Sequence, residues 1–110
     1  MKDSQKYLID VLDTISAIEE IAKDFTITDL DKTANRWALE RGISIIGEAI
    51  YQADKIQKNL PITNLERIKR TRHIVVHEYD VVDREQIFAI VKKHLPILKI
   101  EVENILKNIK

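Results

Sequence analysis

The chain has 110 residues and no cysteine, so it fits one domain, 1–110, with a single core and without disulfides or thiolate metal sites. Hydrophobic residues make up 45% and charged residues 33%, which argues against intrinsic disorder. The formal net charge is zero, so only a local basic patch could attract nucleic acid.

The N-terminal third predicts one helix and a connection. Ser4 can cap this helix, whose apolar residues recur with the 3.6-residue period at Leu8, Leu12, Ile15, Ile18 and Ala22. The start of the chain lacks the apolar core of a signal peptide, and no uncharged run reaches 18 residues. We therefore expect a cytoplasmic protein without membrane contact. The stretch "DFTITD" reads as the connection to the next helix.

A second helix is predicted over 29–57, with two neighbouring apolar stripes. One stripe comprises Leu30, Ala34, Ala38, Gly42, Ile45, Ala49, Ala53 and Ile56, and the other comprises Leu39, Ile43, Ile46 and Ile50. Together they are wider than one partner helix requires, so this helix should have neighbours on two sides, within its own bundle and in a second subunit. Gly42 and Gly47 each cost a helix about 1 kcal/mol relative to alanine, which indicates close backbone approach.

The segment "NLPIT" ends the second helix, and Thr63 followed by Glu66 predicts a capping box. The third helix should lead into "RTRHIVVHEYD", residues 70–80. Asp83 followed by Gln86 predicts the start of a last helix, whose apolar seam is Phe88, Val91, Leu95, Leu98, Val102, Ile105 and Ile109. Pro96 should kink or divide it. The expected fold is all-α, an up-and-down four-helix bundle with a kinked C-terminal helix.

Arg72 is the unusual residue of the third helix. As a helix, this segment has an apolar stripe of Leu65, Ile68, Val75, Val76 and Tyr79, and Arg72 falls in its centre. Either its methylenes cover the core while its head reaches water, or the position is kept for a cation that meets a carboxylate or an anion. His77 is about 140° further round an ideal helix, so the two side chains converge only if the helix ends or bends nearby, or if another chain completes the site.

Other polar residues around Arg72 leave several alternatives open. His73 and His77 have the spacing of two zinc ligands, but the H-E-x-x-H glutamate and a clear third ligand are missing, so we predict no metal site and no cofactor. Arg67, Lys69 and Arg70 form a basic patch that is either a solvated face or a phosphate-binding surface. Two aromatic residues outside the apolar arc of the second helix could stack on bases or lie in an interface: Trp37 and Tyr51.

The segment from Arg72 to Tyr79 has the form R-x-x-x-x-H-x-Y, and it resembles the signature of the HEPN superfamily, specifically its HepT-like toxins. "ALERGISIIGEA", residues 38–49, is similar to the second-helix block of these proteins, which ends in I-G-E-A. "HEYDVVD" and the later Leu95-Pro96 step also resemble them, so the similarity covers most of the chain from residue 29. Asparagine often follows the motif arginine in related proteins, where this chain has His73, whose role stays open.

The resemblance implies a metal-independent endoribonuclease that cleaves RNA through attack by its own 2′-hydroxyl on the adjacent phosphate. His77 would carry the proton, and Arg72 would stabilise the charge that develops on phosphorus. Arg72 would then lie on an apolar face because that face borders a phosphate-binding cleft. Residues expected to assist or to bind RNA are His73, Arg67, Lys69, Arg70, Glu48 and Asp80.

The resemblance also implies partners. Proteins of this group act as homodimers and belong to type VII-like toxin–antitoxin pairs, in which an MNT-type nucleotidyltransferase antitoxin attaches AMP to the tyrosine of H-x-Y, here Tyr79. The alternative is a non-catalytic helical module that binds a nucleotidyltransferase or its substrate.

Overall fold

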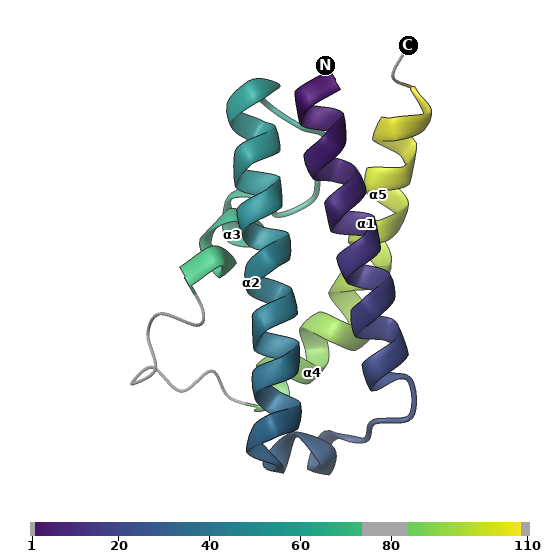
Figure 1. Cartoon of the computed structure of the whole chain (residues 1–110), viewed down its shortest axis with the longest axis vertical. Coiled ribbons are helices and arrows are strands. Elements are labelled where there is room, and N and C mark those ends of the chain that lie inside the picture. Colours follow the sequence, from purple (N-terminus) through teal and green to yellow (C-terminus); the bar gives the residue numbers. More distant parts are fainter. Residues whose placement is uncertain (1, 74–83, 109–110) are drawn as a thin grey trace.

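The computed structural model describes residues 2–73 and 84–108, and all of its regular elements are helical. The chain descends along α1 (Lys2–Ala22), returns along α2 (Thr33–Ile56), and continues through the short α3 (Leu65–Arg70) (Figure 1). A last long element rises beside α1 and consists of α4 (Arg84–Ala89), η3 (Ile90–His94) and α5 (Leu95–Lys107). The expected all-α, up-and-down bundle with a kinked C-terminal helix is confirmed.

The first helix packs through an apolar stripe close to the expected one. Leu8, Ile15, Ile18 and Ala22 are buried, whereas Val11 takes the buried position expected for Leu12, which is only half-buried. Ser4 does not cap the helix, because α1 has already begun before it. Its side chain is fully buried and donates a hydrogen bond to Gln57 Oε1 at 3.3 Å, which ties the start of α1 to the end of α2.

The second helix begins later than expected. Residues Ile27–Asp31 form a 3₁₀ turn, η1, because the Asp29 carboxylate accepts a hydrogen bond from the Thr26 backbone N–H at 2.7 Å. Lys32 is extended, with ψ of 122°, so α2 starts only at Thr33. The predicted helical residues 29–32 therefore belong to the turn and to the cap.

The two stripes of α2 have different surroundings. The stripe of Leu39, Ile43, Ile46 and Ile50 is fully buried in the core. The other is divided: Gly42, Ala49 and Ala53 are buried, but Ala34, Ala38, Ile45 and Ile56 are exposed. A helix that packs against a further helix would present exposed apolar residues such as these. Trp37, which is also on α2, is 65% exposed.

Both glycines of α2 lie where another segment approaches the helix, and the predicted contact with backbone is found at Gly47, whereas Gly42 meets a side chain. A Cβ at Gly42 would come within 2.6 Å of Ile18 Cδ1, so this glycine lets α1 and α2 pack closely. A Cβ at Gly47 would come within 2.6 Å of the Arg72 backbone nitrogen and within 2.9 Å of the Ile68 carbonyl oxygen. The second contact brings the chain after α3 against α2.

The expected capping box of the third helix is wrong. The residue before α3 is Asn64, which has a left-handed backbone with φ of 59° and makes no side-chain cap. Thr63 instead donates its hydroxyl to Glu101 Oε2 at 2.6 Å and its backbone N–H to Glu101 Oε1 at 3.0 Å. The partner of Thr63 is therefore Glu101 on α5 and not Glu66, so Thr63 links the start of α3 to α5 instead of capping α3.

Pro96 lies just beyond the break that it was expected to cause. The π-helical turn η3 separates α4 from α5 and lies just before Pro96, where the ring and the missing N–H of a proline disturb the preceding helical turn. The predicted seam is buried at Val91, Leu95, Leu98, Val102 and Ile105, while in α4 Ile87 is buried instead of the half-buried Phe88. Asp83 and Ile109 lie outside the described residues.

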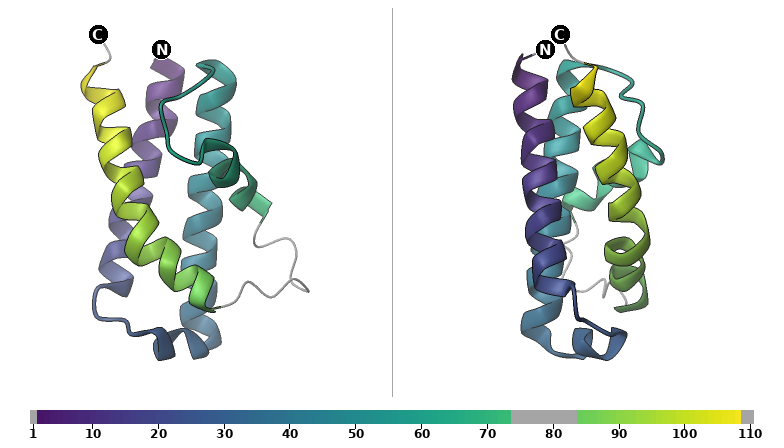
Figure 2. Two further views of the ribbon diagram at one scale, coloured as in Figure 1. Left: turned by 180° about the vertical axis from the view of Figure 1, so that it is seen from behind. Right: turned by 90° about the vertical axis from the view of Figure 1, so that its right-hand side faces the viewer.

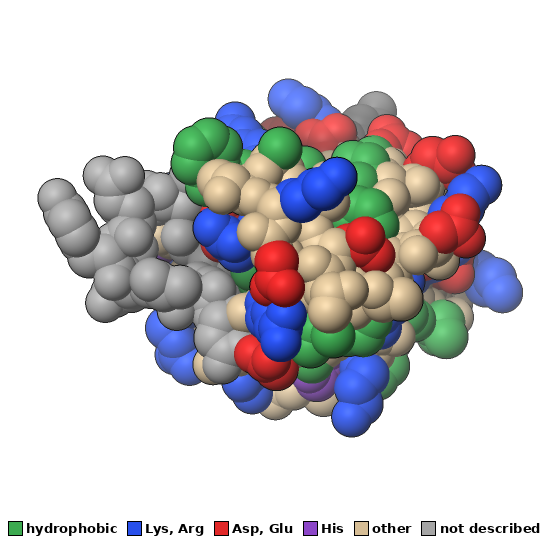
Figure 3. Space-filling model, turned by 90° about the horizontal axis from the view of Figure 1, so that it is seen from below, with side chains coloured by type: hydrophobic (Ala, Val, Ile, Leu, Met, Phe, Trp, Pro, Cys, Tyr) green, Lys and Arg blue, Asp and Glu red, His purple; other side chains and the backbone are tan. Residues whose placement is uncertain are grey.

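The core lies between α1, α2 and the α4–η3–α5 element, with α3 packed across the outside of α2 (Figure 2). Acidic and basic side chains are interspersed on the face shown in Figure 3, in keeping with a net charge of zero. None of the described helices is both long and apolar enough to cross a membrane.

Candidate active site

Arg72 lies in a 3₁₀ turn, η2 (Thr71–His73), and not within the continuing α-helix that the sequence predicted. The α-helix ends at Arg70 because side chains take its last carbonyl groups: Thr71 Oγ1 donates to the Ile68 oxygen at 2.6 Å, and Arg72 Nη1 donates to the Lys69 oxygen at 3.0 Å. Such local bonds compete with helix propagation. The 3.6-residue spacing that placed Arg72 on an apolar stripe therefore does not continue past Arg70.

Three residues of α2 contact Arg72. Ser44 Oγ donates to the Arg72 carbonyl oxygen at 2.9 Å, and the missing side chain of Gly47 leaves room for the Arg72 backbone nitrogen. The ring of Tyr51 lies against the guanidinium, whose central carbon is 3.8 Å from the ring centroid. Arg72 is half-buried, and no carboxylate of the described residues forms an ion pair with it.

The basic patch before Arg72 divides into two kinds of residue. Lys69 is committed to the fold: its ammonium lies 2.7 Å from Asp54 and 2.9 Å from Glu66, and its side chain is 16% exposed. The hydrogen bond with Lys69 lowers the pKa of the Asp54 carboxyl, and the same bond raises the pKa of Lys69. Arg67 and Arg70 are exposed and make no ion pair within the described ranges.

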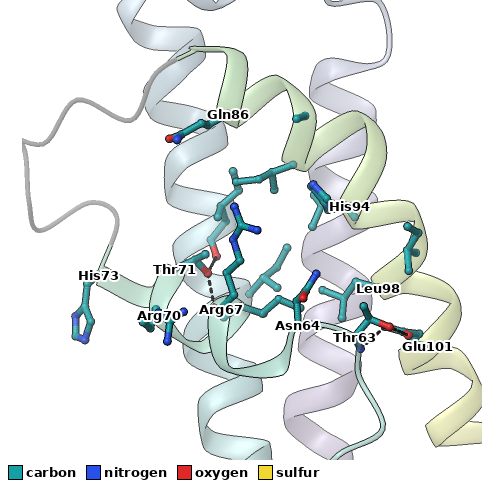
Figure 4. Close-up of a pocket in the computed structure, with 17 residues that line it drawn as sticks. Thr63, Asn64, Arg67, Arg70, Thr71, His73, Gln86, His94, Leu98 and Glu101 are labelled. Atoms are coloured by element: carbon teal, nitrogen blue, oxygen red, sulfur yellow. Dashed lines mark hydrogen bonds between the residues drawn. The ribbon is translucent and has the colours of Figure 1, made fainter.

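A cleft of about 720 Å³ is lined by residues of α2, α3 and the α4–η3–α5 element, and Tyr51 does not line it. Arg67 extends into it from α3, and His94 extends into it from η3 (Figure 4). The apolar lining residues are Ile43, Ile46, Ile68, Ala89, Ile90, Leu95, Ile97 and Leu98. The arginines Arg67 and Arg70 beside an apolar surface suit a ligand that carries both a negative charge and a flat or aliphatic part.

The structure describes only some of the remaining expected site residues. His73 is exposed at the edge of the cleft, and Glu48 is exposed on α2, where it accepts a hydrogen bond from Gln52 at 2.6 Å. His77, Tyr79 and Asp80 lie outside the described residues. The convergence of Arg72 and His77 therefore stays a prediction. Among residues 2–73 and 84–108, no group of three or more acidic or histidine side chains could hold a metal ion.

Sequence reasoning missed how Arg72 is supported. It left Tyr51 as a base-stacking or interface residue, and it gave Ser44 no role. The signal was present, because Ser44, Gly47 and Tyr51 follow one another at steps of three and four residues and so share one face of the helix. That face carries polar residues and a glycine instead of an apolar stripe, so apolar periodicity gives no signal for it. Asp54, the partner of Lys69, was missed for the same reason.

Comparison with known proteins defines the class of this bundle. The family model "Ribonuclease HepT-like" matches residues 11–105. "Probable ribonuclease HepT" of Thermococcus cleftensis is 33% identical over 110 residues, which cover 97% of this chain and 100% of that protein. "Putative RNase MJ1380" of Methanocaldococcus jannaschii is 29% identical over 104 residues, which cover 93% of this chain and 95% of that protein.

No solved structure gives a significant match. The family model nevertheless spans most of the chain, and it includes α2, Arg72 and the whole segment between α3 and α4. The chain belongs to the HepT-like ribonuclease family, which confirms the resemblance found in its sequence.

Proposed function

We propose that this protein is a metal-independent endoribonuclease toxin in which Arg72 and His77 carry the chemistry. The observation that supports it best is the state of Arg72. Its guanidinium is half-buried against an aromatic ring and has no carboxylate partner among the described residues. A cation is seldom kept in such a place without a compensating anion, so an anion from outside the chain fits the position. The phosphate of RNA is the anion that the family suggests.

In the proposed reaction, His77 removes the proton from a ribose 2′-hydroxyl. The freed oxygen attacks the adjacent phosphorus, and the bond to the 5′-oxygen of the next nucleotide breaks. That oxygen takes up a proton, which leaves a 2′,3′-cyclic phosphate and a free 5′-hydroxyl. Arg72 stabilises the additional negative charge on the non-bridging phosphate oxygens during the attack, which is the step where such donors act most strongly. DNA lacks the 2′-hydroxyl and is not cleaved.

Substrate RNA is proposed to lie over α3 and the edge of the cleft. Arg67 and Arg70 are the exposed cations there, whereas Lys69 is already engaged with Asp54 and Glu66. We assign the phosphate contacts to the two arginines and a structural role to Lys69.

The active form is proposed to be a homodimer. The exposed apolar residues of α2, with Trp37 at 65% exposure and Ile45 at 37%, support this, because a monomer would leave them in water. Sedimentation showing a species of 12.8 kDa at micromolar concentration would contradict the dimer.

Neutralisation is proposed to be covalent, by a nucleotidyltransferase antitoxin. The Tyr79 phenol oxygen attacks the α-phosphorus of ATP, pyrophosphate leaves, and AMP stays on the tyrosine. The added phosphate would occupy Arg72 and keep the RNA backbone away. Incubation with ATP, magnesium and the antitoxin, followed by tandem mass spectrometry, should locate AMP on Tyr79. An adduct on another residue would contradict this mechanism.

The test of the nuclease uses purified protein, a defined RNA and EDTA throughout. Arg72→Lys keeps the charge but loses the planar fork, so cleavage should fall by roughly 100-fold or more. His77→Ala should remove cleavage, and both variants should keep their helical circular dichroism. Arg36→Lys is the matched control, since Arg36 donates to a backbone carbonyl at 3.1 Å far from Arg72 and its replacement should leave cleavage unchanged.

A second reading is a non-catalytic module that binds a nucleotidyltransferase or its substrate. Wild-type protein that leaves RNA intact but binds the nucleotidyltransferase with Arg72 required would favour it.

A further inference from the structure

We infer that Tyr51 is a positioning residue, which holds the guanidinium of Arg72 in the orientation that a phosphate needs. This inference rests on the proposed role of Arg72. Tyr51 acts together with Ser44 and Gly47, and the three residues form one face of α2, which we call the Arg72 cradle.

Each residue of the Arg72 cradle fixes a different part of Arg72. Ser44 binds its carbonyl oxygen at 2.9 Å, and Gly47 admits its backbone nitrogen. Tyr51 meets its guanidinium at 3.8 Å. Backbone and side chain are therefore set by successive turns of a single rigid helix. Arg72 follows a helix of only six residues, and without these contacts its orientation would have few constraints.

An aromatic ring is suited to this role because it orients a guanidinium without neutralising it. The attraction acts through the face of the guanidinium plane, whereas hydrogen bonds leave from its edge. A carboxylate in the same place would bind that edge and compete with phosphate. In Arg72 one edge N–H donates to the Lys69 oxygen at 3.0 Å, and the other edge groups make no hydrogen bond within the described part of the chain. They can take a phosphate in the bidentate manner of arginine.

A second cation lies near the ring of Tyr51. Lys55 lies one helical turn after Tyr51, and its ammonium is 5.5 Å from the same ring centroid. Lys55 is exposed and forms no ion pair with any described residue. Two cations near one ring, neither of them in an ion pair with a described residue, bring positive charge together locally although the net charge is zero.

The experiment compares Tyr51→Phe with Tyr51→Leu, and Tyr51→Met serves as a second variant without a ring. RNA cleavage is measured with EDTA present. The phenylalanine ring should keep kcat within about 3-fold of wild type, because the contact uses the face of the ring. Loss of the ring should lower kcat by about 10- to 100-fold, since small displacements of a catalytic group have effects of this size.

Tyr7→Leu is the matched control. Tyr7 is also half-buried and has a lysine ammonium 5.6 Å from its ring, but it lies on α1 and does not contact Arg72. Its replacement should leave kcat unchanged. A loss of kcat in Tyr7→Leu equal to that in Tyr51→Leu would reduce Tyr51 to a packing residue and overturn the inference.

A second readout does not depend on activity. The Arg72 Nε–Hε resonance, assigned by its loss in Arg72→Lys, should be displaced by the ring current of Tyr51. The displacement should persist in Tyr51→Phe and vanish in Tyr51→Leu and Tyr51→Met. An unchanged resonance together with wild-type cleavage in the variants without a ring would overturn the inference. Loss of cleavage in Tyr51→Phe would also overturn it, because the hydroxyl and not the ring would then be required.

The two readouts separate this inference from the proposed function. If wild-type protein and Arg72→Lys cleave RNA equally, the role of Arg72 is wrong, whatever the resonance shows. If Arg72→Lys is inactive but Tyr51→Leu is fully active, the nuclease stands and the positioning role of Tyr51 is wrong.

Discussion

The two contacts that α2 makes through its glycines differ in chemistry. At Gly42, α2 meets the apolar side chain of Ile18 on α1, and the neighbouring residues are fully buried aliphatics. At Gly47 it meets the Thr71 hydroxyl and backbone atoms of Ile68 and Arg72, in a region linked by Ser44, Tyr51 and an ion pair. The first contact supplies hydrophobic burial, which is strong but tolerant of small shifts. The second fixes individual atoms, so it should control activity more than stability.

The largest loss of stability should come from the apolar contact. Ile18 is 2% exposed, so Ile18→Ala should lower the free energy of unfolding by about 3 kcal/mol through lost burial and a cavity. Urea unfolding followed by circular dichroism measures this. RNA cleavage per folded molecule should stay near wild type, and a large loss of cleavage in fully folded protein would show that the two contacts are not separable.

An intermediate effect is expected from filling the second contact. Gly47→Ala would place a methyl group against the Arg72 nitrogen and the Ile68 oxygen, which cannot move without shifting α3 and η2. We expect a loss of about 1–2 kcal/mol in stability and at least about 10-fold in RNA cleavage.

Gly42→Ala is the matched substitution in the same helix. Its methyl group meets the end of the flexible Ile18 side chain, and the gain in helix propensity of about 1 kcal/mol offsets part of the strain. Stability should change by less than about 1 kcal/mol, with cleavage unaffected. Equal effects of the two alanines on cleavage would remove the distinction between the contacts.

The smallest expected effect concerns the ion pair, and it depends on pH. The pKa of Asp54 is lowered in the folded protein by its bond with Lys69, so its contribution to stability is present at neutral pH and disappears as pH falls below the ordinary value of 3.8. Asp54→Asn should therefore cost about 1 kcal/mol at pH 7, and this cost should shrink as pH falls below 3.8. Asn59 can still donate its N–H to the new amide oxygen.

The control for this effect is Asp31→Asn, which breaks an ion pair with Arg84 whose side chains are 61% and 37% exposed. Exposed pairs contribute little, so the change at pH 7 should be smaller than that of Asp54→Asn. Denaturation midpoints at several pH values measure both variants. A cost of Asp54→Asn that is independent of pH would show that the charge of Asp54 does not matter.

The helices and most of the core could be predicted because burial imposes a period on the sequence. Ile15, Ile43 and Val102 follow that period and are buried as expected. The caps could not be predicted in the same way. Thr63 pairs with Glu101, which is 38 residues away, and no local pattern shows that a distant carboxylate will be the better partner.

The candidate site residues were predicted from their chemical types, and their geometry was not predicted. Arg72 was notable because its charge interrupts an apolar stripe. That stripe exists only if the α-helix continues past Arg70, and in the structure it ends there. The bonds that end it are made by Thr71 and by Arg72 itself. Apolar periodicity does not record such local bonds between side chain and backbone, so it could not distinguish the 3₁₀ turn from a continued helix.

The π turn at Ile90–His94 has an evolutionary consequence. Such a turn contains one residue more than the α-helix around it, and it is the product expected from a single insertion. Removing one residue from it would rotate α4 by about 100° relative to α5, and Pro96 would still interrupt the hydrogen bonds between the two helices. Ile87 would then leave the core. We expect homologous chains to keep the length of this turn even where its side chains differ, because its residue count aligns two helices.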